Sequence, residues 1–131
     1  MVDCKILIID DDKDDVEILS EAFLECGVDG VHYVYTAMQA FMYLQEMEHE
    51  CLPKLIITDH FLPGMTGADF LKDLKRMDKY KHIHVIVLST VKTDKELERY
   101  KEVGAADYLI KPSSYDEYVK VAADIKSRVG L

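Results

Sequence analysis

Apolar stretches alternate regularly with amphipathic stretches along the 131 residues of the chain. The run CKILIID, for example, is aliphatic and unbroken, which is typical of a strand buried on both faces of a sheet. The stretch that follows it carries apolar residues at helical spacing and ends near a glycine. By the same criteria, strands are predicted at residues 4–10, 31–35, 54–59, 84–89 and 107–110. Helices are predicted at residues 14–27, 36–47, 68–77, 94–104 and 114–129.

This order of elements defines a fold class. Five successive strand–helix units predict an α/β domain, in which helices cover both faces of a five-stranded parallel, doubly wound sheet. Ligands of such sheets bind beyond the carboxyl ends of the strands, where the strand order reverses. The sequence contains no repeat, linker or low-complexity segment, so we expect a single domain over residues 1–131 with no output domain.

Composition narrows the range of functions. The hydrophobic content of 49% and charged content of 31% are ordinary for a folded globular domain, and the net charge of −9 disfavours direct nucleic-acid binding. Cys4, Cys26 and Cys51 form no CxxC pair and are interpreted as reduced thiols. No apolar run approaches the ~20 residues that span a bilayer, and the N-terminal MVDCK lacks the basic start of a signal peptide. We therefore expect a cytoplasmic protein without membrane association.

Polar side chains follow four of the predicted strands. Asp10 and Asp11 end the first strand, Asp59 the third, Ser89 the fourth and Lys111 the fifth. Carboxylates that lie a few ångströms apart repel one another, so a proton or a cation is needed among them. Hard oxygen ligands with open water positions suit Mg²⁺. Beside such an ion, a carboxylate can act as a nucleophile toward phosphorus, while a lysine neutralises the phosphoryl oxygens.

Four motifs occur in an order and spacing that resemble a known family. LIIDD, LIITDHFLPGMTG, VIVLST and GAADYLIKP together resemble the receiver domain of two-component response regulators, over essentially all 131 residues. The resemblance implies a flavodoxin-like (βα)5 fold with strand order 2-1-3-4-5. It implies further that Asp59 is the phosphoacceptor and that Asp10, Asp11, Asp59 and the backbone carbonyl of Phe61 bind Mg²⁺.

The resemblance also implies a conformational switch. Ser89 and Lys111 would contact the phosphoryl group, and Lys111 precedes Pro112, whose peptide bond is often cis in the family. As the loop after the fourth strand moves, space would open for Tyr108 to turn inward. This movement would change a partner-binding surface. That surface is formed by the helix at 94–104, the strand at 107–110 and the last helix.

The implied activity is signalling rather than catalysis on a separate substrate. A phosphohistidine of a histidine kinase or of a histidine phosphotransfer protein would donate its phosphoryl group to Asp59, and small phosphodonors such as acetyl phosphate often serve too. The protein would catalyse only its own phosphorylation and dephosphorylation. Its output would be recognition of a downstream protein.

Some residues depart from the family pattern. Thr90 stands where alanine or glycine is usual and is expected to narrow access to Asp59. Phe61 and Val91 are apolar at positions that often influence hydrolysis, so we predict that they shield the acyl phosphate from water. His60 is interpreted as a surface residue rather than a proton donor.

The same residues admit other interpretations. Asp12, Asp14 and Asp15 are expected to be a solvated helix N-terminus, which acidic residues favour. The DxDxD pattern from Asp10 resembles the start of an EF-hand loop, but Asp15 stands at the sixth place, where glycine is required. It also resembles a haloacid-dehalogenase-type phosphatase, although Asp14 stands where Thr or Val is usual. A receiver fold that binds proteins without being phosphorylated is a third alternative.

Tyrosines on the predicted helices and the last strand admit a structural role as well. Tyr108 could be core packing, and Tyr100, Tyr115 and Tyr118 are interpreted as half-buried helix packing rather than a partner surface.

Overall fold

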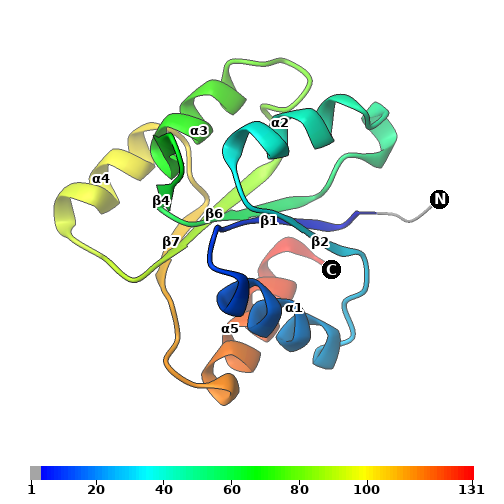
Figure 1. Ribbon diagram of the computed structural model, residues 1–131, viewed down its shortest axis with the longest axis vertical. Helices are drawn as coiled ribbons and strands as arrows, with labels where there is room; N and C mark the ends of the chain where they lie inside the picture. Colours follow the sequence, from blue (N-terminus) through cyan, green and yellow to red (C-terminus); the bar gives the residue numbers. More distant parts are fainter. Residues whose placement is uncertain (1–3) are drawn as a thin grey trace.

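The computed structural model describes residues 4–131 and contains a five-stranded sheet, a short hairpin and five α-helices (Figure 1). The prediction that the chain carries no signal peptide falls partly on residues 1–3, which lie outside the described residues. The strands of the sheet are β1 (Ile6–Ile9), β2 (Val31–Val34), β3 (Leu55–Thr58), β6 (His84–Ser89) and β7 (Asp107–Ile110). The helices are α1 (Lys13–Glu25), α2 (Ala37–Gln45), α3 (Gly67–Lys75), α4 (Asp94–Glu102) and α5 (Tyr115–Val129).

All five strands of the sheet are parallel, in the order β2-β1-β3-β6-β7. In the register of the central strands, Ile6 of β1 lies between Val31 of β2 and Leu55 of β3. The strand order reverses between β1 and β3, so the predicted order of a flavodoxin-like sheet is confirmed. The carboxyl ends of β1 and β3 therefore meet at the point where a doubly wound sheet binds its ligand.

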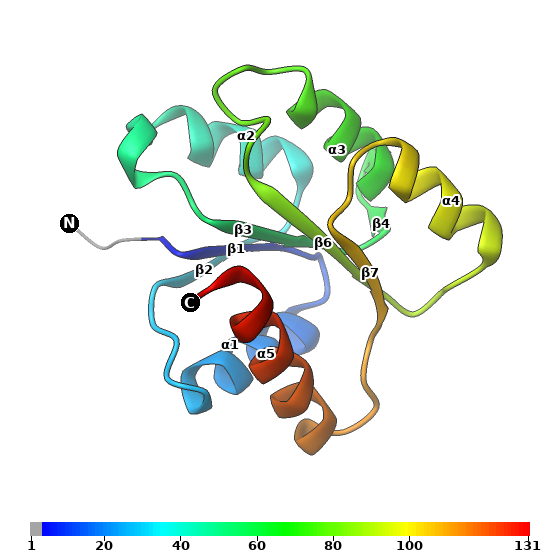
Figure 2. The same ribbon diagram turned by 180° about the vertical axis from the view of Figure 1, so that it is seen from behind.

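Helices cover both faces of the sheet. Helices α1 and α5 lie on one face, and α2, α3 and α4 lie on the other (Figures 1 and 2). Successive residues of β1 alternate between the two layers: Ile6 and Ile8 pack with α1 and α5, whereas Leu7 and Ile9 pack on the opposite side. Because each fully buried aliphatic side chain contributes about 1.5–3 kcal/mol, the two cores hold the strand ends in place.

Side-chain caps begin each of the five helices. The capping residues are Asp12, Thr36, Thr66, Thr93 and Ser114. At Thr36, the Gln39 N–H donates to the side-chain hydroxyl at 3.0 Å. The Gln39 side chain, however, accepts from the N–H of Tyr35, one residue before the cap. These caps satisfy N–H groups that have no partner within the helix.

The element boundaries differ from prediction mainly at helix C-termini. Helix α1, for example, ends at Glu25, two residues before the glycine that was expected to close it. A hairpin of β4 (Phe61–Leu62) and β5 (Met65–Thr66) lies in the segment predicted as loop, and a 3-10 turn covers His49–Cys51. Strands of two residues are too short to show a hydrophobic period. Within residues 4–131, no helix has the length and apolar character that crossing a bilayer requires.

Candidate functional site

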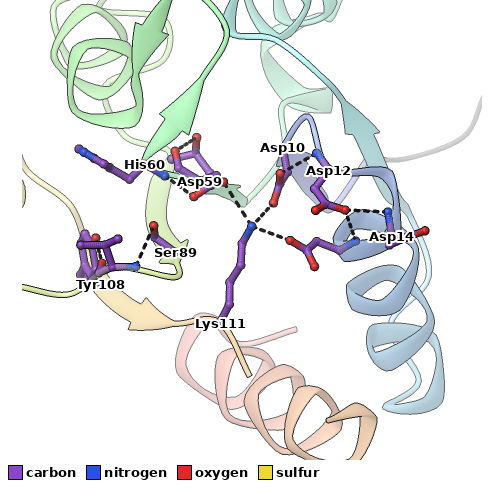
Figure 3. Close-up of polar contacts among 11 residues, drawn as sticks. Asp10, Asp12, Asp14, Asp59, His60, Ser89, Tyr108 and Lys111 are labelled. Atoms are coloured by element: carbon purple, nitrogen blue, oxygen red, sulfur yellow. Dashed lines mark hydrogen bonds and ion pairs between the residues drawn. The ribbon is translucent and has the colours of Figure 1, made fainter. Parts of the chain in front are cut away.

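The carboxyl ends of four strands bring their polar side chains to one edge of the sheet (Figure 3). Asp10 follows β1, Asp59 follows β3, Ser89 ends β6 and Lys111 follows β7. Asp10, Asp59 and Ser89 are all buried, Ser89 completely. The predicted convergence of strand ends is confirmed for these residues, and it creates a polar site on top of two apolar layers.

Three carboxylates of this site are close enough to share a cation. One oxygen each from Asp10, Asp11 and Asp59 lies within 4.8 Å of the others, with Asp11 on the exposed side. Burial raises the pKa of Asp10, and contacts with Lys111 counteract that shift only in part. Oxygen ligands on one side and solvent on the other are the arrangement that suits Mg²⁺, which retains several of its waters. The donor set therefore fits the ion expected from the sequence.

Lys111 compensates the negative charge. Its ammonium lies 2.7 Å from a carboxylate oxygen of Asp15, 2.8 Å from Asp10 and 3.2 Å from Asp59. Burial alone would lower the pKa of Lys111, but the hydrogen bonds to Asp10 and Asp15 and the charge of Asp59 raise it above its ordinary value. Lys111 is therefore a permanent cation between two strand ends and a helix.

Asp15 belongs to this site, which the sequence analysis did not anticipate. Of the three acidic residues assigned to a solvated helix N-terminus, Asp12 caps α1 and Asp14 is exposed, as expected. Asp15 instead forms the shortest of the three ion pairs of Lys111, so the interpretation was wrong for this residue. The partners lie 96 residues apart in the sequence, and no local pattern joins them.

Ser89 and Tyr108 lie on the other side of Asp59 (Figure 3). The Ser89 hydroxyl accepts the N–H of Val91 at 3.5 Å, and the Tyr108 hydroxyl donates to the carbonyl of Val91. Tyr108 is only 3% exposed, and burial raises its pKa. The ring expected to turn inward in an activated state is thus already inward in this structure.

His60 is not the surface residue that the sequence analysis expected. It is 7% exposed, and its Nδ1 lies 2.6 Å from the hydroxyl of Tyr100 in α4. Tyr100 itself is buried, and so is Tyr118, whereas Tyr115 is exposed. The predicted packing is therefore confirmed for Tyr100 and Tyr118, which are buried more deeply than expected, and it is wrong for Tyr115. The prediction for His60 was wrong for a physical reason: its hydrogen-bond partner Tyr100 lies 40 residues away in the sequence.

Phe61, Thr90 and Val91 all lie at the rim of the site. Phe61 is 56% exposed and its ring contacts the ring of His60, with centroids 4.7 Å apart. Thr90 and Val91 are exposed too. Metal binding by the Phe61 carbonyl and shielding by Phe61 and Val91 stay predictions. No cis peptide bond occurs among the described residues, so the bond between Lys111 and Pro112 is trans.

Gly67, the last residue of the LIITDHFLPGMTG motif, packs directly against the site. A Cβ at this position would lie 2.5 Å from the carbonyl oxygen of Asp59 and 2.9 Å from the hydroxyl of Tyr100. Its N–H donates to the carbonyl of His60 at 2.8 Å. The first turn of α3 can approach the Asp59 peptide this closely because glycine has no side chain.

Comparisons with known proteins define the class to which this fold and site belong. Residues 6–123 match the response regulator receiver domain family, and the chain belongs to that family. Receivers of this family interact with histidine kinases or phosphotransfer proteins, and they bind Mg²⁺ at an acidic pocket. The membership, together with Asp12 as the cap of a helix that follows a strand, removes the EF-hand interpretation of the DxDxD stretch.

Individual relatives agree with this assignment. The chain is 33% identical to the two-component response regulator ORR12 of Oryza sativa subsp. japonica over 107 residues, which cover 82% of this chain and 85% of that protein. The phosphorylated cyanobacterial phytochrome response regulator RcpA has a similar structure, with a TM-score of 0.83, 26% identity and coverage of 95% and 92% of the two chains. The Mn²⁺-bound response regulator Rcp1 gives a TM-score of 0.77 at 26% identity, with coverage of 93% and 91%.

Proposed function

We propose that this protein is the phosphoacceptor of a two-component phosphorelay and that Asp59 is the residue phosphorylated. The observation that carries the proposal is the convergence of Asp10, Asp11, Asp59 and Lys111 at one edge of the sheet. A nucleophilic carboxylate, a seat for a divalent cation and a fixed ammonium are the parts that phosphoryl transfer requires.

The proposed reaction transfers a phosphoryl group from a phosphohistidine of a histidine kinase or a histidine phosphotransfer protein. A carboxylate oxygen of Asp59 forms a bond to phosphorus while the P–N bond breaks. The electron pair of the P–N bond stays with the departing imidazole nitrogen. Mg²⁺ held by Asp10, Asp11, Asp59 and the Phe61 carbonyl would supply positive charge for the phosphoryl oxygens. Lys111 would contact a phosphoryl oxygen from the opposite side, and the Ser89 hydroxyl would donate a hydrogen bond to another.

The output would be recognition of a downstream protein by α4, β7 and α5. Ile110 at the end of β7 and Tyr115 at the start of α5 are 44% and 41% exposed, which leaves apolar groups available to a partner. An acyl phosphate brings additional charge and acceptor oxygens to Asp59, and Ser89 and Lys111 would move toward them. The catalysis proposed is limited to phosphorylation and dephosphorylation of the protein itself.

Intact-mass measurement after incubation with acetyl phosphate tests the proposal. With Mg²⁺, we expect the mass to increase by one phosphoryl group, and we expect no increase after chelation of the metal or in Asp59→Asn. Asp78→Asn is the matched control, because the Asp78 side chain is 95% exposed and pairs only with the neighbouring Lys81 among the described residues. Phosphorylation of Asp59→Asn to the wild-type extent would disprove the assignment.

One observation favours a second candidate function. Tyr108 is buried and hydrogen-bonded to the loop after β6. Its ring therefore points inward already in the unphosphorylated chain. A receiver in this state could bind its downstream protein without phosphorylation. Equal affinity of such a partner for the wild type and Asp59→Asn, both with and without beryllofluoride, would support this function over the first.

A further inference from the structure

His60 connects the phosphoacceptor to α4 through both nitrogens of its ring. Nδ1 shares a hydrogen bond of 2.6 Å with the Tyr100 hydroxyl, and Nε2 lies 3.8 Å from a carboxylate oxygen of Glu96. Tyr100 and Glu96 occupy the same face of α4, four residues apart. The ring points away from Lys111 (Figure 3), so it lies outside the charged cluster. The two ring nitrogens instead face residues of α4, a helix that contributes no residue to the charged cluster.

The backbone of His60 is attached to Asp59 just as closely. Its N–H donates to Oδ1 of Asp59 at 2.7 Å, and its carbonyl accepts the N–H of Gly67 at 2.8 Å. The packing around Gly67 is so close that even a Cβ at this position would clash with the Asp59 carbonyl and the Tyr100 hydroxyl. A displacement of the Asp59 peptide in this tight packing cannot be absorbed locally and would reach Tyr100.

Apart from this contact, helix α4 packs on the core through Leu97, which is partly buried. Of its nine residues, all within the described part of the chain, Tyr100 is the one that is buried. The Tyr100 ring also packs on the ring of Tyr108, with centroids 5.1 Å apart. The position of α4 therefore depends largely on what holds Tyr100, and elements with few buried contacts are those that move most readily.

A buried carboxylate oxygen of α4 would gain a hydrogen-bond partner if the helix shifted. One carboxylate oxygen of Glu96 is buried and has no hydrogen-bond partner within residues 4–131. A shift of roughly 1 Å would bring it from 3.8 Å to hydrogen-bond distance of Nε2 of His60. A buried oxygen without a partner is unfavourable, so such a shift would be compensated by the new bond.

We propose that the pair His60–Tyr100 couples the phosphorylation state of Asp59 to the position of α4, in addition to any movement of Tyr108. This coupling rests on the proposed function. Conversion of the Asp59 carboxylate into an acyl phosphate removes charge from the carboxyl oxygens, which weakens the charge-assisted bond from the His60 N–H. His60 then shifts with its peptide, and Tyr100 and α4 follow. Because coupling is reciprocal, the state of α4 also affects the affinity of the site for a phosphoryl group.

Hydrogen exchange of the α4 amides with and without beryllofluoride and Mg²⁺ tests the coupling. In the wild type, we expect beryllofluoride to change α4 exchange on the order of fivefold, a typical size for coupling between sites. In Tyr100→Phe, which keeps the ring and removes the hydroxyl, we expect less than a third of that response. Tyr80→Phe is the matched control, because Tyr80 is buried in the same core at 5% exposure and should respond like the wild type.

His60→Phe and the double variant His60→Phe/Tyr100→Phe supply the second measurement. Because both substitutions break the same hydrogen bond, adding Tyr100→Phe to His60→Phe should change the beryllofluoride affinity no further. Additive effects, or a wild-type α4 response in Tyr100→Phe that still binds beryllofluoride, would overturn the coupling alone. Failure of the wild type to bind beryllofluoride would overturn the proposed function and the coupling with it.

Discussion

Two regions on opposite sides of Asp59 differ in the kind of contact they make. On the Lys111 side, one ammonium and three carboxylates from β1, α1, β3 and β7 form ion pairs of 2.7–3.2 Å. On the His60 side, aromatic rings from β7, α4 and the end of β3 pack and share a hydrogen bond. The charged side is suited to holding an anion and a cation, and the aromatic side to transmitting a displacement. The proposed chemistry and the proposed coupling thus depend on different residues, and variants on the two sides should have different effects.

The largest effect is expected from Lys111→Met, which removes the cation from the charged side. Loss of one group that stabilises the transferring phosphoryl typically lowers the rate by about 10²–10³-fold. Without a metal, two buried carboxylates also lose their partner, and the free energy of unfolding should fall by about 3 kcal/mol. Single-turnover phosphorylation and urea denaturation measure the two effects. Lys120→Met, at an exposed position of α5, should change neither, and a Lys111→Met rate within threefold of the wild type would contradict the role of Lys111.

Asp11→Asn should weaken Mg²⁺ binding while leaving the folded protein intact. Asp11 is exposed and takes no part in the ion pairs of Lys111, so its carboxylate is free for a metal. We expect Mg²⁺ affinity to fall about tenfold, which is roughly 1.4 kcal/mol of binding free energy. The thermal stabilisation by a fixed Mg²⁺ concentration should shrink accordingly. Asp14→Asn makes the same change of charge in the first turn of α1, and an equal loss of Mg²⁺ affinity in both variants would show only a general electrostatic effect.

Asp15→Asn should accelerate phosphorylation of Asp59. The ion pair with Asp15 holds Lys111 from the side of α1, and a neutral amide there would let the ammonium move toward the phosphoryl group. A partly exposed ion pair contributes about 1 kcal/mol, so the expected increase in rate is about fivefold. Asp14→Asn again serves as the control for charge, and Asp15→Glu should restore the slower rate. Equal rates in Asp15→Asn and Asp14→Asn would remove Asp15 from the proposed mechanism.

The smallest effect is expected at the rim, from Phe61→Asn. If the ring shields the acyl phosphate from water, the half-life of the phosphorylated protein should shorten by more than about twofold, which corresponds to about 0.4 kcal/mol. Leu24→Asn is the matched control, because Leu24 is 67% exposed on α1. Decay of the isolated phosphorylated protein, followed by intact mass, gives the half-lives. A half-life that shortens by less than about twofold, or lengthens, in Phe61→Asn would contradict the shielding.

The charged side could be predicted from the sequence to a large extent, and the aromatic side could not. Asp10, Asp59 and Lys111 each follow a recognisable strand, and the carboxyl ends of parallel strands meet at one edge of a sheet. His60 was misjudged because nothing next to it in the sequence indicates burial. A signal was present elsewhere, since Leu97 and Tyr100 are the large apolar residues among the charges of DKELERYKE. That pattern predicts that Tyr100 faces the sheet.

The sequence by itself determined the order of strands and helices, the class of fold and the charged residues that follow the strands. Hydrophobic period and capping residues are local properties, and the parallel sheet follows from their order. The tertiary structure alone decided that Asp15 pairs with Lys111 and that His60 meets Tyr100, at separations of 96 and 40 residues. Such pairs depend on how the helices pack across the sheet, because the burial of a side chain is set by the elements that surround it rather than by its neighbours along the chain.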